Sequence, residues 1–316
     1  MTLPASIRDR LALPAICAPM FLVSGPRLVI EACKAGVIGG LPAANARDPE
    51  GFAAWMDQIG QELAQAAEAD PKRRIAPLAV NLSLLKTRQD VFEANLAICK
   101  RHRVPLVITA VGDPTEAIKR VHDYGGLVFH DVTTMRHAEK AIAAGADGLT
   151  AIGWGGGGHS GTLNHFAFVE MVRAIFDGTI VLAGSISTGR AIRAAEVLGA
   201  DLAYLGTRFI ATRESMAPEP YKQIMVADGP DDVIYTPAIS GVPANFLKSS
   251  IRCVGLDPDR LPPPKGVFQA DLPGDLRAWR DIWSAGQGIG LIKDIPTVAE
   301  LVQRLKQEYE AARALP

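Results

Sequence analysis

Residues 136–152 read RHAEKAIAAGADGLTAI and contain one complete helix-to-strand unit. Small apolar residues recur at three- and four-residue spacing from Arg136 to Ala144, which predicts an amphipathic helix. Gly145 follows at a position where glycine commonly closes a helix, and Gly148–Ile152 then has the length and composition of a buried strand. The stretch therefore predicts a helix that leads directly into a strand of a parallel sheet.

The same unit recurs along the whole chain, because short apolar or β-branched runs alternate with longer segments at helical spacing. Strands are predicted at Ala15–Met20, Val37–Gly40, Ile75–Leu82, Leu106–Ala110, Leu127–Asp131, Gly148–Ile152, Ile180–Ala183 and Leu202–Leu205. Helices are predicted between them at Pro26–Ala35, Pro49–Ala69, Asp90–Lys100, Pro114–Tyr124, Arg136–Ala144, Phe166–Phe176 and Thr188–Leu198, with Ser187 or Thr188 as the N-cap of the last one.

This alternation predicts an α/β protein, and eight βα units close most naturally into a (β/α)8 TIM barrel. The alternative is an open, doubly wound sheet. Against it, the first strand-to-helix turn, residues 20–26, lacks the G-x-G-x-x-G of a dinucleotide-binding fold.

After the eighth strand the pattern changes, and residues 215–274 become rich in proline and glycine with only short helical stretches. We interpret them as an inserted lid after strand 8, because they offer too few periodic apolar positions for a second core. The barrel would then comprise residues 1–214 and 275–316. A last amphipathic helix, Thr297–Ala314, would complete it.

The chain has 316 residues, of which 48% are hydrophobic and 21% charged, and a formal net charge of −1. This charge would not gather nucleic acid or an anionic membrane, so we expect a small-molecule partner. Four scattered cysteines fit neither a zinc site nor a disulfide framework, and each is expected to be a buried apolar residue. The N-terminus has no signal-peptide pattern and no apolar run could span a bilayer, so we expect a cytoplasmic location. The oligomeric state stays open, and a homodimer is one of the states allowed.

Two short runs at the ends of strands seven and eight are candidates for a phosphate site. They are Ala183-Gly184-Ser185 and Gly206-Thr207, and each opens a helix. Small residues there allow backbone N–H groups to turn inward, and TIM barrels commonly bind phosphate on these two loops. The alternative is two ordinary tight turns, which also favour glycine and serine.

Earlier strand ends add further candidates for the mouth of the barrel. Pro19-Met20-Phe21 follows the first strand, and Asn81 closes the third, where its carboxamide could meet the edge of a heterocycle. Asn81 could equally turn the chain. His130 and Asp131 could line the same mouth or satisfy each other at the end of strand five.

Strand six leads into the glycine loop, which we define as Gly153–Gly161 with the sequence GWGGGGHSG. It could be a flexible surface loop with an incidental histidine. Its place at the carboxyl end of a strand, beside the predicted phosphate site, favours His159 as a functional residue. A neutral imidazole can accept a proton from an acidic carbon or stabilise a developing anion. The histidine spacing suggests no metal site.

Taken together, these motifs resemble the nitronate monooxygenases, formerly called 2-nitropropane dioxygenases, and their flavin-dependent relatives, a quinone reductase and an enoyl-acyl carrier protein reductase. The resemblance covers nearly the whole chain. It is carried by the segments Ala18–Met20, Val80–Leu84, Gly157–Gly161, Ala183–Ile186, Gly206–Phe209 and Trp283–Gln287.

The resemblance implies a TIM barrel that binds FMN without a covalent bond and uses His159 as the catalytic residue. The main chain around Met20 would pack on the flavin, Asn81 would bond its ring edge, and Gly157 and Gly158 would approach it. Gln287 would lie nearby, and the loops after strands seven and eight would hold the phosphate. The glycine loop would then be bare because a flat cofactor lies against it.

The implied reaction is the oxidation of alkyl nitronates, or of nitroalkanes deprotonated by His159, with O2 to a carbonyl compound and nitrite. Two alternatives remain: an NAD(P)H-dependent flavin reductase of quinones or enoyl thioesters, and a flavin-free isomerase or lyase that binds a phosphorylated substrate. This chain has Gly155-Gly156 where many members have Glu-Ala, and Gly184-Ser185 where many have Gly-Gly. The exact activity is therefore less determined than the fold.

Overall fold

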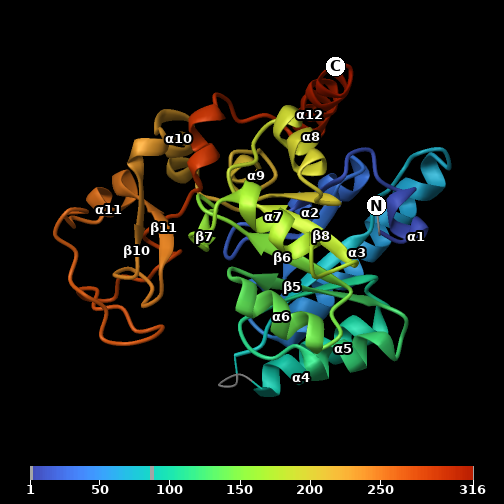
Figure 1. Cartoon of the computed structure of the whole chain (residues 1–316), viewed down its shortest axis with the longest axis horizontal. Helices are drawn as coiled ribbons and strands as arrows, with labels where there is room; N and C mark the ends of the chain where they lie inside the picture. Colours follow the sequence, from blue (N-terminus) through green and yellow to red (C-terminus); the bar gives the residue numbers. More distant parts are fainter. Residues whose placement is uncertain (1–2, 86–88, 316) are drawn as a thin grey trace.

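The computed structural model describes residues 3–85 and 89–315, and its central feature is a closed parallel barrel (Figure 1). Around the barrel the strands run β1-β2-β3-β4-β5-β6-β8-β9, and β1 pairs with β9 to close the ring. Their bounds are β1 Ala15–Cys17, β2 Ile38–Pro42, β3 Leu78–Ser83, β4 Leu106–Ala110, β5 Leu127–Val132, β6 Gly148–Ile152, β8 Thr179–Ala183 and β9 Leu202–Leu205. The predicted (β/α)8 barrel is confirmed, and every predicted strand overlaps an observed one.

Helices surround the barrel and join successive strands. Their bounds are α1 Ala5–Arg8, α2 Pro26–Lys34, α3 Pro49–Ala69, α4 Gln89–Arg101, α5 Thr115–His122, α6 Met135–Ala143, α7 His165–Arg173, α8 Gly189–Val197, α9 Thr207–Ile210 and α12 Val298–Arg313, with a 3-10 turn at Ala43–Asn45. Thr188 caps α8, as one of the two expected N-caps, by accepting from Ala191 N at 3.2 Å. The predicted last helix is present as α12 and packs on α8 and α2, and its N-terminus carries a capping box between Thr297 and Glu300.

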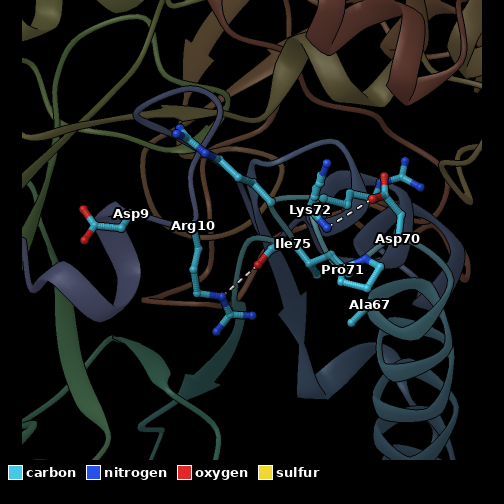
Figure 2. Close-up of a pocket in the computed structure, with 9 residues that line it drawn as sticks. Asp9, Arg10, Ala67, Asp70, Pro71, Lys72 and Ile75 are labelled. Atoms are coloured by element: carbon cyan, nitrogen blue, oxygen red, sulfur yellow. Dashed lines mark hydrogen bonds between the residues drawn. The ribbon is translucent and has the colours of Figure 1, made fainter.

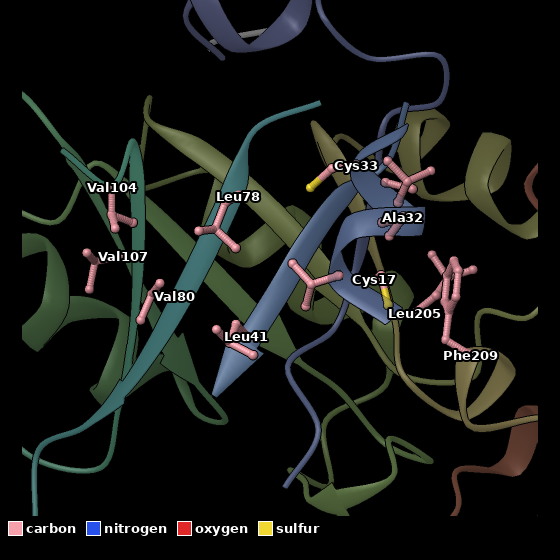
Figure 3. Close-up of a cluster of buried hydrophobic side chains, with 14 of the residues drawn as sticks. Cys17, Ala32, Cys33, Leu41, Leu78, Val80, Val104, Val107, Leu205 and Phe209 are labelled. Atoms are coloured by element: carbon pink, nitrogen blue, oxygen red, sulfur yellow. The ribbon is translucent and has the colours of Figure 1, made fainter. Parts of the chain in front are cut away.

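Alternating side chains give the barrel an inner and an outer core. The inner cluster fills the barrel and includes Ile16, Ile108, Phe129 and Val181. The outer cluster lies between strands and helices, and Figure 3 shows part of it. Adjacent residues of one strand therefore belong to different cores, and this alternation decides which polar side chains at the strand ends can reach the barrel interior.

A smaller unit follows α9, and we call it the lid. It contains α10 Glu219–Ala227, a 3-10 turn Pro230–Asp232, β10 Val233–Thr236, β11 Ala244–Leu247 and α11 Lys248–Cys253, and the chain returns to the barrel through a second 3-10 turn, Gln287–Leu291. In Figure 1 it projects from one end of the barrel, in orange. The sequence analysis expected only short helices here, so the two strands are a correction. The division at residues 215 and 275 remains a prediction.

The lid sheet has an unexpected third strand. Its order is β10-β11-β7, and β7, Gly158–His159, comes from the glycine loop of the barrel. Behind the sheet, Phe246, Ile251 and Ile282 form a separate buried cluster against which Trp279 packs. The lid therefore has a small core of its own, and one strand of its sheet comes from a loop of the barrel.

Two further expectations can be compared with the described part of the chain. Cys17, Cys33 and Cys99 are buried, and burial raises the pKa of Cys33 and Cys99 to about 12. Cys253, at the end of α11, is exposed, so the expectation of burial was wrong for this residue. Among residues 3–85 and 89–315, no helix is long and apolar enough to cross a membrane, and no group of three His, Cys, Asp or Glu side chains could hold a metal ion.

Candidate active site

The glycine loop leaves the carboxyl end of β6 and is folded tightly on the barrel rim. Gly161 N donates to Ile152 O at 3.2 Å, and Trp154 N donates to Leu163 O at 2.8 Å. Gly155 and Gly158 have positive φ values of 76° and 74°, a region that glycine enters at little cost. These contacts give the loop a defined conformation, which argues against a flexible surface loop.

The missing side chains of this loop make room for another part of the same chain. A Cβ atom on Gly155 would lie 2.6 Å from Oε1 of Gln287 and 2.6 Å from Oγ of Ser185, and one on Gly157 would lie 3.1 Å from Gly286 N. Gln287 N donates to Gly155 O at 2.9 Å. At Gly155 the side chains of Gln287 and Ser185 take up this space, and at Gly157 the backbone of Gly286 does so. The approach of a cofactor to Gly157 and Gly158 stays a prediction.

Polar groups of the lid hold the glycine loop from the other side. The side-chain amide of Asn245, which is 3% exposed, donates to Gly156 O at 2.6 Å and to Ser160 Oγ at 3.0 Å. Gly158 N donates to Ser284 Oγ at 2.7 Å, and this hydroxyl donates to Asn245 O at 2.6 Å. The network binds the backbone before His159 and the side chain of Ser160 after it.

His159 itself lies at the end of β7, where its backbone pairs with Ala244 of β11. Its ring meets two lid rings edge-on: Phe268 at a centroid distance of 5.9 Å and Trp279 at 5.3 Å. The side chain keeps an exposed edge, yet desolvation by the surrounding protein lowers the pKa of His159. The imidazole is therefore neutral at pH 7 and able to accept a proton.

The loop after β8 has the geometry expected of an anion site. Gly184 and Ser185 have positive φ values of 113° and 57°, and such successive residues can turn their N–H groups toward one side. For serine this conformation is strained, and strained residues cluster at ligand sites. The Ser187 hydroxyl is buried without a hydrogen-bond partner in the described residues. A phosphate would satisfy groups that the protein alone leaves unused, so these residues fit a phosphorylated cofactor.

The other residues predicted for the phosphate site lie around this loop. Ala183 ends β8, and its carbonyl oxygen lies 3.2 Å from Nε2 of His165. Gly206 precedes the short helix α9, and Thr207 Oγ1 accepts from Gly286 N at 2.9 Å. The Thr207 hydroxyl therefore already binds the segment around Gly286, which leads from the lid back to the barrel. Because this segment also binds the glycine loop, it holds the loop after β9 and the glycine loop together.

The loop after β1 is shaped by a residue that the sequence analysis did not single out. Asn45 donates through Nδ2 to Met20 O at 2.9 Å and accepts from Leu22 N at 2.8 Å. The Met20 sulfur lies 3.7 Å from the position that a Cβ atom of Gly206 would take, and Phe21 is exposed. The main chain around Met20, which is expected to face a flavin, is thus held next to Gly206 in the loop after β9.

Pro19 and Asn81 complete the strand-end candidates. A Cβ atom on Gly40 would lie 2.6 Å from Cδ of Pro19, so the first loop packs closely on β2. Asn81 is half-buried, and its Nδ2 donates to Ile108 O at 3.2 Å. Its neighbours Val80 and Leu82 belong to the outer core, so Asn81 occupies an inward position, as expected for a group at the barrel mouth.

His130 does not join these residues. Phe129 lies in the inner cluster, so His130 has the opposite orientation, and its Nδ1 lies 2.8 Å from the hydroxyl of Thr109. Desolvation by burial is the main cause that lowers the pKa of His130 to about 4. Its expected place in the cofactor site is therefore wrong, because strand alternation points this side chain into the outer layer.

Asp131 takes the inward position instead. It pairs in register with Thr150 of β6, and Asp131 Oδ1 and Thr150 Oγ1 are both buried without a hydrogen-bond partner in the described residues. Desolvation by burial raises the pKa of Asp131 to about 7. The buried charge of Asp131 also contributes to a raised pKa of Tyr204. The interior beneath the rim therefore holds a carboxyl group that can keep a proton near neutral pH.

A separate cavity of 370 Å³ opens at the other end of the barrel (Figure 2). It is lined by Asp9, Arg10, Ala67, Asp70, Pro71, Lys72, Arg73, Arg74 and Ile75, which precede β1 and β3. In TIM-barrel enzymes the active site lies at the carboxyl ends of the strands. This cavity lies at the amino ends, so it is not the candidate site.

The closed barrel, together with a neutral histidine and a phosphate-type loop at the carboxyl ends of its strands, defines a TIM-barrel enzyme. The nitronate monooxygenase family model matches residues 9–308, and the chain belongs to this family. The family consists of flavin-dependent oxidoreductases, so the implied cofactor is a flavin. The sequence-based identification is confirmed at this level.

Individual relatives agree with the family assignment. A nitronate monooxygenase of Paraburkholderia phytofirmans is 28% identical, with 95% of this chain and 94% of that protein covered. A Mycobacterium tuberculosis protein described as a monooxygenase is 29% identical over 75% of this chain, and the match spans less than two thirds, 63%, of that protein. The solved structure of a nitroalkane oxidase from Streptomyces ansochromogenes is similar with a TM-score of 0.79 and 28% identity, and 98% of this chain and 99% of that one are covered.

Proposed function

We propose that the protein is an FMN-dependent nitronate monooxygenase that oxidises alkyl nitronates with O2 to a carbonyl compound and nitrite. The observation that carries this proposal is the neutral His159, held by the lid on the rim of a family barrel whose β8 loop has the left-handed Gly184 and Ser185 and a buried Ser187 hydroxyl without a partner in the described residues. FMN would supply the electron-accepting chemistry, and the protein would orient it and exclude side reactions.

The residues proposed to hold the cofactor surround the barrel mouth. The phosphate would lie on Ala183, Gly184, Ser185, Gly206 and Thr207, with the Ser187 hydroxyl as an additional donor. The ring would lie against Pro19, Met20 and Phe21, with Asn81 at its edge and Gly157, Gly158 and Gln287 on the side of the returning chain. A single phosphate loop favours FMN over a dinucleotide flavin, since the G-x-G-x-x-G motif is absent from the first strand-to-helix turn.

His159 would act on the substrate rather than on the cofactor. Because its imidazole is neutral, it can take the acidic α-proton of a nitroalkane, and the resulting imidazolium would stabilise the anionic nitronate beside it. A nitronate supplied as the anion needs no such proton transfer. The lid network would keep the ring in place during this step, because Asn245 and Ser284 bind the main chain at Gly156 and Gly158, just before His159.

Two measurements on the purified protein test the proposal. Extraction of the bound flavin should yield FMN, and oxygen uptake should begin on addition of an alkyl nitronate, with nitrite as a product. A reductase of quinones or enoyl thioesters would instead bleach its flavin rapidly on anaerobic mixing with NADH. A colourless protein that does not take up FMN would overturn the proposal and favour a flavin-free isomerase or lyase.

A further inference from the structure

Two lid side chains bound the space beside His159. Phe268 and Trp279 approach its ring edge-on, with interplanar angles of 88° and 71°. Phe268 is 45% exposed, and Trp279 rests on the fully buried Phe246 at a centroid distance of 4.7 Å. A substrate that touches the exposed edge of His159 therefore meets aromatic surface that the fold has left free.

Both aromatic residues have a backbone conformation that side chains of this kind avoid. Phe268 has a φ of 57° and Trp279 a φ of 70°, in the left-handed region. Phe268 is the third residue of a tight turn that is closed by Gln269 N donating to Gly266 O at 3.0 Å. Glycine or asparagine is preferred at a left-handed turn position, so a phenylalanine there stores strain for which the turn itself offers no reason.

The surrounding polypeptide explains how the strain is maintained. A Cβ atom on Gly241 would lie 2.2 Å from Gln269 N and 2.7 Å from Phe268 N, so the neighbouring loop packs directly on this turn. Trp279 N donates to Ile282 O at 2.9 Å, which ties Trp279 to the buried cluster of the lid. Two independent segments thus hold two strained aromatic residues against one histidine.

Two cations in the segment around Phe268 and Trp279 are paired with carboxylates. Desolvation by the surrounding protein lowers the pKa of His159. Lys265 binds Asp271 at 2.6 Å, and Arg280 binds Asp281 at 2.8 Å. A second carboxylate on a substrate would meet the aromatic edges of Phe268 and Trp279 next to His159.

We propose that Phe268 and Trp279 form an aromatic wall that selects nitronates with an aryl or other bulky apolar tail over those with a small or a charged tail. The wall is a specificity element, and it rests on the proposed function, in which His159 meets the nitronate head. Trp279 also packs on the buried cluster of the lid, whereas Phe268 is exposed, so it is the strain at Phe268 that we attribute to substrate binding.

Inert carboxylates test the wall without turnover, because a carboxylate imitates the planar, singly charged nitronate head. Isothermal titration of the flavin-loaded protein should give a dissociation constant for phenylacetate about tenfold below those for acetate and succinate. Phe268→Gly should abolish this preference while the melting temperature stays equal or rises, since glycine relieves the left-handed strain. Phe166→Ala, which removes a 69% exposed phenylalanine on α7, should keep the preference.

Several results would overturn the proposal. They are equal binding of the three carboxylates by the native protein, no measurable binding of any of them, or a preserved preference in Phe268→Gly. A fall in melting temperature for Phe268→Gly would show that the residue serves the lid and not the ligand. The proposed function can fail separately. If the protein prefers phenylacetate through Phe268 but oxidises no nitronate, the aromatic wall is supported and the proposed nitronate oxidation is refuted.

Discussion

Asn245 of the lid donates its side-chain amide to the carbonyl oxygen of Gly156 at 2.6 Å, three residues before His159. The amide is buried and also reaches Ser160 Oγ, so one lid residue binds the backbone before His159 and the side chain after it. The position of the proposed base is therefore set by a residue about 90 positions further along the chain. Functional residues commonly lie on loops that the rest of the fold holds in place in this way.

Asn245→Ala should loosen the glycine loop. The loss leaves Gly156 O without its donor, which should cost about 1–3 kcal/mol of stability, and it should lower kcat on nitroalkanes while the flavin stays bound. Asn164→Ala is a matched control, because Asn164 only caps α7 through Phe166 N at 3.0 Å. Chemical denaturation and steady-state kinetics check both variants. Equal kinetic losses in the two variants would contradict a positioning role for Asn245.

His159→Asn should separate the two substrate forms. Removal of a general base should slow oxidation of neutral nitroalkanes by about 10²–10⁴-fold, whereas preformed nitronates should lose much less because they need no proton transfer. The measurement is kcat/KM from oxygen uptake, with each nitronate prepared in base and added immediately. Similar losses on the two forms would remove His159 as the base.

Gly155→Ala should destabilise the protein, because a Cβ atom there would approach Gln287 and Ser185 at 2.6 Å and the φ of 76° disfavours alanine. The two side chains can shift, but the backbone strain stays, so we expect a loss of about 1–3 kcal/mol. Gly60→Ala is a control that should stabilise the protein. Gly60 lies within α3 with nothing within 4 Å of its Cβ position, so alanine should raise the free energy of unfolding by about 0.5–1 kcal/mol. Urea denaturation compares the pair. A stable Gly155→Ala variant would refute the packing explanation for the glycine loop.

Asp131→Asn should stabilise the flavin-free protein in a pH-dependent way. The folded pKa of Asp131 is raised from 3.8 to about 7, so the folded state holds a proton that the unfolded chain releases from about pH 4 upward. Below pH 4 the carboxyl group is protonated in both states and carries no penalty. Between pH 4 and 7 the penalty grows by about 1.4 kcal/mol per pH unit at most, and it is constant above pH 7. Asparagine does not titrate, so its advantage should appear across this window.

Melting temperatures of the two proteins from pH 4.5 to 8 check this expectation. Asp113→Asn is a control that should destabilise the protein. Hydrogen bonds from Thr115 lower the pKa of Asp113, so the stability that this carboxylate contributes is lost only as the solution becomes more acidic. A difference between native protein and Asp131→Asn that does not change with pH would mean that Asp131 has an ordinary pKa.

The barrel could be predicted from the sequence because each of its strands and helices is a local, strongly periodic segment. The orientation of single residues could not be predicted in the same way. Residues 127–132 form a strand that is buried on both sides, so its composition gives no alternation that separates inside from outside. His130 was therefore placed at the mouth, where Asp131 faces inward. Because side chains alternate along a strand, an error of one residue exchanges the inward and the outward side chain.

The lid itself was predicted as an insertion, but its strands could not be predicted, for another reason. Its strands are short, at most four residues, and β11 pairs with β7, which lies more than 80 residues earlier. Such pairing leaves no local periodicity to detect. One signal was available: Asn245 interrupts the apolar run Ala244–Leu247, just as Asn81 interrupts Leu78–Leu82, and a buried amide needs partners.

The strand shared by barrel and lid limits how this enzyme can be redesigned. Because β7 contributes Gly158 and His159 to the lid sheet, a lid transplanted from a relative would bring its own strand edge to the proposed base and reset its position. A successful graft must carry the β11 strand, Ser284 and the glycine loop as one cassette. Changes confined to the turn around Phe268 leave that cassette intact, so they offer the simpler route to a new substrate range.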